Sequence, residues 1–135
     1  MTRRKDWPSR FAALVEEARL RPFEWGVHDC CLWAADSVLA LTGVDHALGL
    51  RGTYADALAA RRVLDALGGY AGAAALAGPE IAPALAGAGD VGLVASGAED
   101  GVSLGVCTGI EWLCVGDAGL LRFPLASAQR AWRVA

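Results

Sequence analysis

Apolar residues recur every three or four positions along three segments in the first half of the chain. These segments run from Pro8 to Leu20, from Cys30 to Leu41 and from Ala57 to Leu67. Such spacing gathers the apolar side chains on one face of a helix, with polar residues on the other. We therefore predict three helices. Arg21-Pro22 ends the first, because the residue before a proline avoids the helical conformation, and Gly43 ends the second.

A polar turn precedes the third helix. Thr53-Tyr54-Ala55-Asp56 resembles a capping box, in which the first and fourth side chains bond to free N–H groups at a helix start. We expect Thr53 to open this helix and Gly68-Gly69 to close it. The stretch from 70 to 89 is rich in alanine, glycine and proline, and we expect a short helix there, around Ala73 to Ala77.

From Gly89-Asp90 onward the apolar segments become short and are separated by turn residues, as in strands. The predicted strands are Val91–Ala95, Val102–Cys107, Ile110–Val115 and Gly119–Phe123. Their close spacing favours an antiparallel meander, because parallel crossovers need about a dozen residues. We expect a short helix from Pro124 to Ala128 and a last strand at Trp132 to Val134.

Helices followed by a meander predict an α+β domain, with N-terminal helices packed on a small antiparallel sheet. The 135 residues suit one domain, mainly helical over 1–88 and mainly β over 89–135. Hydrophobic residues make up 55% of the chain and charged residues 20%, which indicates a globular protein rather than a disordered one.

The net charge of −3 argues against nucleic acid as a partner, and the basic run Arg3-Arg4-Lys5 is most simply a solvated end. No apolar run reaches the ~20 residues that span a bilayer, and no signal peptide is evident. We therefore expect synthesis in a reducing bacterial cytoplasm, four free cysteines and no transmembrane segment. No cofactor motif is found, and we expect no cofactor.

The turn into the second helix carries a candidate nucleophile. Asp29 is well placed as the N-cap, since its carboxylate can accept the free N–H groups of the first turn. Cys30 would then be the first helical residue, where the helix dipole favours a thiolate. The structural alternative is that Cys30 is a packed core or cap residue, because free cysteine is commonly buried.

Three motifs follow one another in the order found in a known superfamily. Asp29-Cys30 opens a helix, Gly89-Asp90-Val91-Gly92 opens the first strand, and Ser103-Leu104-Gly105-Val106 lies in the next. This order resembles the NlpC-type cell-wall peptidases, the bacterial relatives of papain. The resemblance implies a papain-like fold with Cys30 as nucleophile. The third motif is usually His-Val-Gly-Ile in those enzymes, so Ser103 stands where their histidine is expected.

A second resemblance extends over nearly the whole length. Its motifs are Phe23-x-Trp25-Gly26-x-x-Asp29-Cys30, Arg51-Gly52-x-Tyr54, Leu104-Gly105-Val106-Cys107-x-Gly109 and Ala131-Trp132-Arg133-Val134. They are similar to those of a subfamily of small phage and prophage proteins encoded among tail genes. This resemblance implies assembly into a phage-like tail, with other tail proteins of the tip or hub as partners and possible contact with peptidoglycan.

The serine at position 103 matters because a cysteine nucleophile needs a base to take its proton and an acid to protonate the leaving amine. Serine does neither at neutral pH. The chain has two histidines, His28 and His46. His28 lies two residues before Cys30 and would need a tight turn to reach the sulfur, whereas His46 lies in a loop.

The other cysteines and the nearby tryptophan are expected to pack in the core or to line the cleft. We expect Cys31 and Cys114 to be packing residues, and Cys107 to line the cleft in the strand that faces the Cys30 helix. Trp25 is expected to line the same cleft and to pack the helix on the sheet, or else to form part of a partner interface. A zinc site from His28, Cys30, Cys31 and Cys107 lacks the usual ligand spacing.

Trp33 and Asp36 complete the expectations for this helix. Trp33 is expected to pack against the sheet with Trp25. Asp36 is either exposed or a buried partner for a backbone group or for Arg51.

Two functions follow from these observations. The first is a structural or assembly protein of a phage, prophage or gene-transfer-particle tail, which keeps a peptidase scaffold without catalysis. The second is an active cysteine hydrolase that cuts amide bonds in peptidoglycan, with Cys30 as nucleophile and His28 as a candidate base. The absent histidine favours the first, and Asp29-Cys30 at a helix start favours the second.

Overall fold

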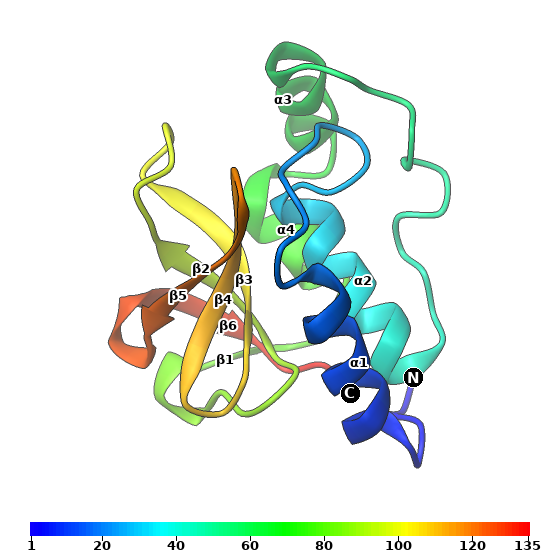
Figure 1. Cartoon of the computed structure of the whole chain (residues 1–135), viewed down its shortest axis with the longest axis vertical. Coiled ribbons are helices and arrows are strands. Elements are labelled where there is room, and N and C mark those ends of the chain that lie inside the picture. Colours follow the sequence, from blue (N-terminus) through cyan, green and yellow to red (C-terminus); the bar gives the residue numbers. More distant parts are fainter.

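A computed structural model describes the whole chain, residues 1–135, as an α+β protein of four helices and a six-stranded antiparallel sheet (Figure 1). The helices are α1 (Trp7–Ala18), α2 (Cys30–Thr42), α3 (Ala57–Ala66) and α4 (Gly69–Ala75). The strands are β1 (Glu80–Ile81), β2 (Val91–Ala95), β3 (Val102–Cys107), β4 (Glu111–Gly116), β5 (Gly119–Pro124) and β6 (Ala128–Trp132), with 3₁₀ turns η1 (Pro83–Leu85) and η2 (Leu125–Ser127). No helix has the length and apolar character that crossing a bilayer requires.

The sheet has the order β1-β6-β2-β3-β4-β5, so that β2 to β5 form the predicted meander. Its last strand differs from the prediction. Trp132 ends β6 rather than beginning the final strand, and the expected helix after Pro124 is the single turn η2. The exposed Gln129 and Arg130 interrupt the apolar pattern of β6, but its backbone still pairs with β2.

Helices α2 and α4 pack on the sheet, α1 lies beside α2, and α3 packs on α4 (Figure 1). Trp33 of α2 is fully buried against Leu104, Val106 and Trp132 of the sheet, as expected. Trp25 does not share that role, because it is 38% exposed and packs edge-on against Phe23, with ring centroids 4.6 Å apart. It precedes α2 in an exposed turn and cannot reach the core.

The start of α3 corrects the capping-box prediction. Asp56, not Thr53, is the N-cap, and its carboxylate accepts from the backbone N–H of Ala59 at 2.8 Å. The Thr53 hydroxyl instead donates to the carbonyl of Leu50 at 2.6 Å, which stabilises the preceding turn. Residues Gly68 and Gly69 both have positive φ (93° and 77°), so the chain turns sharply there and α4 begins earlier than predicted.

Asp90, at the start of β2, holds the two ends of the chain together. Its Oδ1 atom accepts from the Val134 backbone N–H at 3.0 Å and pairs with the Arg3 guanidinium at 3.1 Å. The next residue, Arg4, donates its backbone N–H to the carbonyl of Leu41 at 2.7 Å, near the C-terminal end of α2. The contacts around Asp90 therefore lie at the opposite end of α2 from Cys30.

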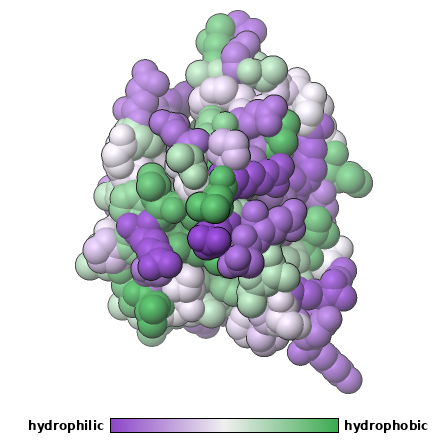
Figure 2. All heavy atoms as spheres, in the orientation of Figure 1, coloured by the Kyte–Doolittle hydropathy of each residue, from purple (hydrophilic) through white to green (hydrophobic).

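Several large hydrophobic side chains also reach the surface. Figure 2 shows hydrophobic atoms gathered among hydrophilic ones on one face of the molecule. Leu58 on α3 is 63% exposed, Leu121 on β5 is 51% exposed, and both lie at the rim of the cavity described below. Exposed apolar groups at the rim of a cavity are typical of binding surfaces.

Candidate functional site

Asp29 fixes the entry to α2. As predicted, it is the N-cap, and its Oδ1 atom accepts from the backbone N–H of Leu32 at 3.0 Å. Its Oδ2 atom accepts from the Gly26 N–H at 3.0 Å and from the Tyr54 hydroxyl at 2.6 Å. Burial and then this hydrogen bond raise the pKa of Tyr54. The buried carboxylate therefore connects the turn before α2, the helix itself and the loop before α3.

Strands β3 and β4 separate beside Cys30, the first residue of α2. They pair only at Val106–Leu113 and Cys107–Trp112. Beyond that point the Leu113 carbonyl accepts instead from the indole N–H of Trp33, at 3.0 Å. This bond attaches α2 to the sheet where the ladder ends.

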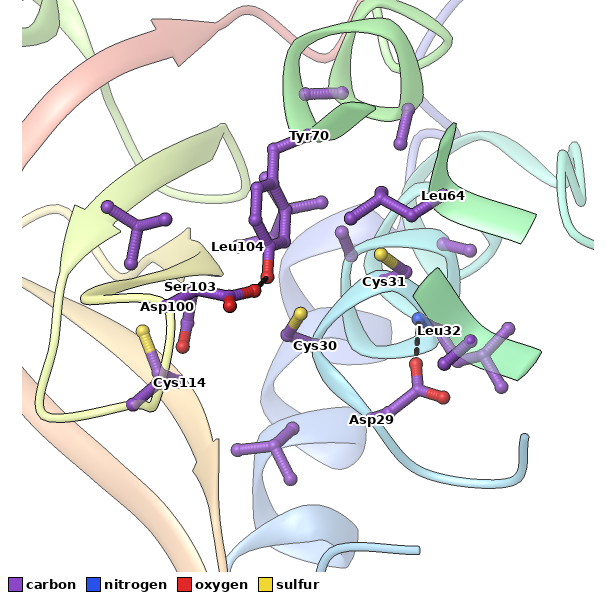
Figure 3. Close-up of a pocket in the computed structure, with 18 of the residues that line it drawn as sticks. Asp29, Cys30, Cys31, Leu32, Leu64, Tyr70, Asp100, Ser103, Leu104 and Cys114 are labelled. Atoms are coloured by element: carbon purple, nitrogen blue, oxygen red, sulfur yellow. Dashed lines mark hydrogen bonds between the residues drawn. The ribbon is translucent and has the colours of Figure 1, made fainter. Parts of the chain in front are cut away.

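The separation leaves room for a cavity of about 840 Å³ between the start of α2, helices α3 and α4, and the sheet. Its walls are mostly hydrophobic. In Figure 3, Cys30 and Cys31 lie on the helix side, and Ser103 and Cys114 on the strand side. The volume falls within the range of small-molecule sites, about 300–1,000 Å³.

A hydrogen-bonded bridge crosses this cavity. The Tyr70 hydroxyl of α4 donates to Oδ2 of Asp100, in the β2–β3 turn, at 2.7 Å, close to Cys30 and Ser103 (Figure 3). Arg61 of α3 binds the other oxygen of Asp100, also at 2.7 Å. We call these three residues the roof. Burial and the bond to Asp100 raise the pKa of Tyr70.

The two adjacent thiols differ in acidity. Hydrogen bonding from the Cys31 thiol, and then from backbone N–H groups of Leu104 and Cys31, lowers the pKa of Cys30 against the effect of burial. The same contact and burial raise the pKa of Cys31. Across the cavity, burial raises the pKa of Cys114 to about 12. Of these three thiols, Cys30 is therefore the one whose pKa is shifted toward the thiolate.

His28 does not line the cavity that contains Cys30. It lines a separate cavity of about 310 Å³ between α1 and α2, together with Leu14, Arg21 and Asp36. The His28 backbone forms a bridge with Glu24, and the ring packs edge-on against Trp33 at 6.1 Å between centroids. The tight turn that His28 would need to reach the sulfur is therefore not formed, because these contacts direct the ring to the other side of α2.

His46, by contrast, does line the larger cavity. The neighbouring Asp45 binds Arg51 at 3.0 Å, and Arg51 also pairs with Asp36 at 2.7 Å, as one alternative for Asp36 predicted. Asp36 is six residues beyond Cys30 on α2, which corresponds to about 9 Å of helix rise. Because Asp45 is linked through Arg51 to Asp36, the neighbouring His46 lies alongside the middle of α2, away from the helix start.

Ser103 occupies the strand side of the cavity near the sulfur. Its side chain is largely buried, and its hydroxyl shares a hydrogen bond with the Ser96 hydroxyl at 3.0 Å. The position where the peptidase resemblance expects a histidine therefore holds an alcohol, whose partner is another alcohol. Neither group accepts a proton from a thiol near neutral pH.

A family profile described as "Domain of unknown function (DUF6950)" matches residues 2–134. The chain belongs to the DUF6950 family. No curated protein and no solved structure matches it. The chemistry of this DUF6950 domain therefore has to be argued from its own geometry.

Two further expectations for the DUF6950 domain need correction. Cys107 does not line the cavity. It is fully buried in a second core cluster with Val94, Trp112 and Ala131, which contains no helix residue. Cys114, expected only to pack, belongs to this cluster and also lines the cavity. Trp25 lines the cavity at its exposed rim.

No three His, Cys, Asp or Glu side chains of the DUF6950 domain lie close enough together to hold a metal ion. The zinc set considered above is divided by the fold. Cys30 and Cys31 lie in the larger cavity, His28 in the smaller one, and Cys107 in the second core cluster.

Sequence reasoning missed the roof. Arg61, Tyr70 and Asp100 come from α3, α4 and the β2–β3 turn, so no local motif links them. The one available signal was a tyrosine in a segment of small apolar residues, which indicates a hydroxyl in need of a partner.

Proposed function

We propose that this protein is a structural or assembly component of a phage-like tail, built on a degenerate NlpC-type scaffold that no longer cuts amide bonds. The proposal is supported by Cys30 at the start of a helix packed on β3. Ser103, in the position of the family histidine, is the observation that carries it. The tail context comes from the sequence motifs.

The chemistry around Cys30 favours binding without amide cleavage. An amine leaves a tetrahedral intermediate only when an acid protonates it. The raised pKa values of Cys31, Tyr70 and Cys114 mean that each holds its proton near neutral pH. Both oxygens of Asp100 already accept hydrogen bonds from the other roof residues.

The apolar rim suits a partner protein. Trp25, Leu58 and Leu121 come from three separate segments and expose hydrophobic surface around one cavity. A tail component needs such a surface to bind its neighbours. The partner is expected to insert apolar side chains at this rim.

The missing base can be tested by restoring it. We expect the wild-type protein to leave peptidoglycan stem peptides intact, and the Ser103→His variant to release new amino groups from them. The double variant Ser103→His, Cys30→Ser is the control and should be inactive. Cleavage by the wild type that depends on Cys30 would contradict the proposal.

The tail role needs its own test. A strain that lacks the gene should assemble incomplete tails, visible by electron microscopy. We expect complementation by Cys30→Ser but not by Trp25→Asp with Leu58→Asp, because the rim binds the partner. Normal tails in the deletion strain would contradict an assembly role.

The second candidate, an active cysteine hydrolase, is favoured by the lowered pKa of Cys30. Its test is the pH dependence of Cys30 alkylation with Cys107 and Cys114 changed to serine and Cys31, the donor to the sulfur, retained. A transition well below ~8.5, together with Cys30-dependent amide cleavage by the wild type, would establish the hydrolase. Alkylation near the ordinary thiol value would exclude an activated nucleophile.

A further inference from the structure

Cys30 lies at the start of α2 on the wall of the larger cavity, where hydrogen bonding from Cys31 lowers the pKa of its thiol. The side chains near it in Figure 3 include the Ser103 alcohol, the Tyr70 phenol and the Cys114 thiol. The Asp100 carboxylate also lies there, but both of its oxygens accept hydrogen bonds from the other roof residues. Such a nucleophile can attack a carbonyl but cannot assist the departure of an amine. It can act on an acyl compound whose leaving group departs without a proton.

A thiolate is such a leaving group. Ordinary thiols have pKa values of about 8.5, so a thiolate departs as an anion without the acid that an amine needs. Exchange between a thiolate and a thioester therefore requires only a nucleophile and a place for the acyl group. The missing histidine, which prevents amide cleavage, does not prevent this reaction.

The cavity beside Cys30 provides a place for an apolar acyl group. One of its walls is formed by Val63 and Leu64 of α3, by Leu67 directly after that helix, and by Ala73 and Ala74 of α4. Leu64 and Ala74 are buried in the protein, so this wall is part of the fold rather than loose surface. The cavity, at about 840 Å³, is large enough for a medium-length hydrocarbon chain.

We propose that Cys30 is an acylation site that accepts an apolar acyl group from a thioester, with the acyl chain held in the cavity between α3, α4 and the sheet. The Cys30 thiolate attacks the carbonyl carbon and forms a carbon–sulfur bond. The tetrahedral intermediate then breaks its bond to the original sulfur. The leaving thiolate takes a proton from solvent, and the protein retains the acyl group as a thioester.

The acyl group stays on Cys30 because hydrolysis needs an activated water molecule. His28 lies in the other cavity, and Ser103 is paired with Ser96. The nearby Asp100 carboxylate is not free to activate water, because both of its oxygens accept hydrogen bonds from Tyr70 and Arg61. The product is therefore a stable, stoichiometric adduct rather than a turnover intermediate. This inference rests on the proposed function only through the missing acid and base, and it is independent of tail assembly.

The probes are S-octanoyl-N-acetylcysteamine and its S-acetyl counterpart, each added to the full chain at pH 7 and followed by intact-protein mass spectrometry. We expect one octanoyl group per chain, mapped to Cys30 and absent in Cys30→Ser. The octanoyl compound should react about tenfold faster or more, because burial of even two methylenes corresponds to that factor. Equal rates for both probes would overturn the role of the cavity.

A matched pair of variants separates the cavity from general thiol reactivity. Ala60 and Ala59 are neighbouring, half-buried residues of α3, but only Ala60 lines the cavity. Ala60→Phe should slow octanoyl transfer by about tenfold and leave acetyl transfer unchanged, whereas Ala59→Phe should change neither. Circular dichroism checks that both variants are folded. Equal effects of the two substitutions would contradict the assignment of the acyl chain to this cavity.

The outcomes also distinguish this inference from the proposed function. Absence of the octanoyl adduct, with stem peptides left intact, would overturn only the acylation site. Rapid release of free octanoate that depends on Cys30 would reveal an active base and overturn both. Amide cleavage by the wild type would overturn the proposed function, and persistence of the octanoyl adduct would still support acylation.

Discussion

The two cavities on either side of α2 separate the two residues considered as nucleophile and base. Cys30 lies in the larger one, against the sheet, and His28 in the smaller one, against α1. The two residues are separated in sequence only by Asp29, yet the start of the helix directs their side chains to opposite sides. His28 therefore does not reach Cys30. Closeness in sequence does not make a catalytic dyad.

Asp29 maintains this division, and its replacement should have the largest effect, a loss of stability. Asp29→Ala removes an N-cap and leaves the Tyr54 hydroxyl and the Gly26 N–H without their partner. We expect the free energy of unfolding in urea to fall by about 3 kcal/mol or more. Asp56→Ala, which removes the exposed cap of α3, should cost only about 1 kcal/mol. Similar losses in both variants would contradict the central role of Asp29.

His28 should make the smaller cavity sensitive to acid. Its ring is buried with neither nitrogen hydrogen-bonded, and burial, followed by the charge of Arg21, lowers its pKa. The folded protein thus binds this proton less well than the unfolded chain. The stability from neutral His28 is complete above the unfolded pKa of ~6.5 and decreases as pH falls below it.

The pH profile of stability tests this difference. His28→Phe should flatten the loss of unfolding free energy between about pH 7 and pH 5, as measured by urea denaturation at each pH. Cys30→Ser alters the other cavity and should keep the wild-type slope. An unchanged slope in His28→Phe would mean that other groups cause the acid sensitivity.

A substitution in the roof of the larger cavity should have the smallest effect of the three. Tyr70→Phe removes one hydrogen bond to Asp100 and should raise the rate of Cys30 alkylation by iodoacetamide by a few-fold, at most about tenfold. Arg130→Gln breaks the exposed ion pair with Glu80, far from the cavity, and should leave the rate unchanged. An unchanged rate in Tyr70→Phe would show that the roof does not limit access.

Local signals predicted the parts of the site that depend on neighbouring residues. Asp29 as the N-cap and Cys30 as the first helical residue follow from the chemistry of one turn. The strands β2 to β5 follow from apolar segments and turn residues to within one residue at each end. The side of the helix that His28 faces depends on α1, which packs there from a distant part of the chain.

Cys107 shows what strand alternation alone cannot predict. Ser103 and Cys107 are four residues apart in β3 and therefore belong to the same face of the strand. Ser103 reaches the cavity because β3 and β4 have separated there, whereas Cys107 lies in the paired region beside Trp112. The point at which the two strands separate depends on Trp33 of α2, whose indole N–H donates a hydrogen bond to the Leu113 carbonyl.

The contacts of Asp90 have a practical consequence for handling the protein. They hold Arg3 and Val134 together, and Arg4 lies at the C-terminal end of α2, which is about 20 Å long. In Figure 1 both chain ends lie at the same side, away from α3. Immobilising the protein on a sensor surface through either end should therefore leave the mouth of the Cys30 cavity facing the solution, available to partners and acyl donors alike.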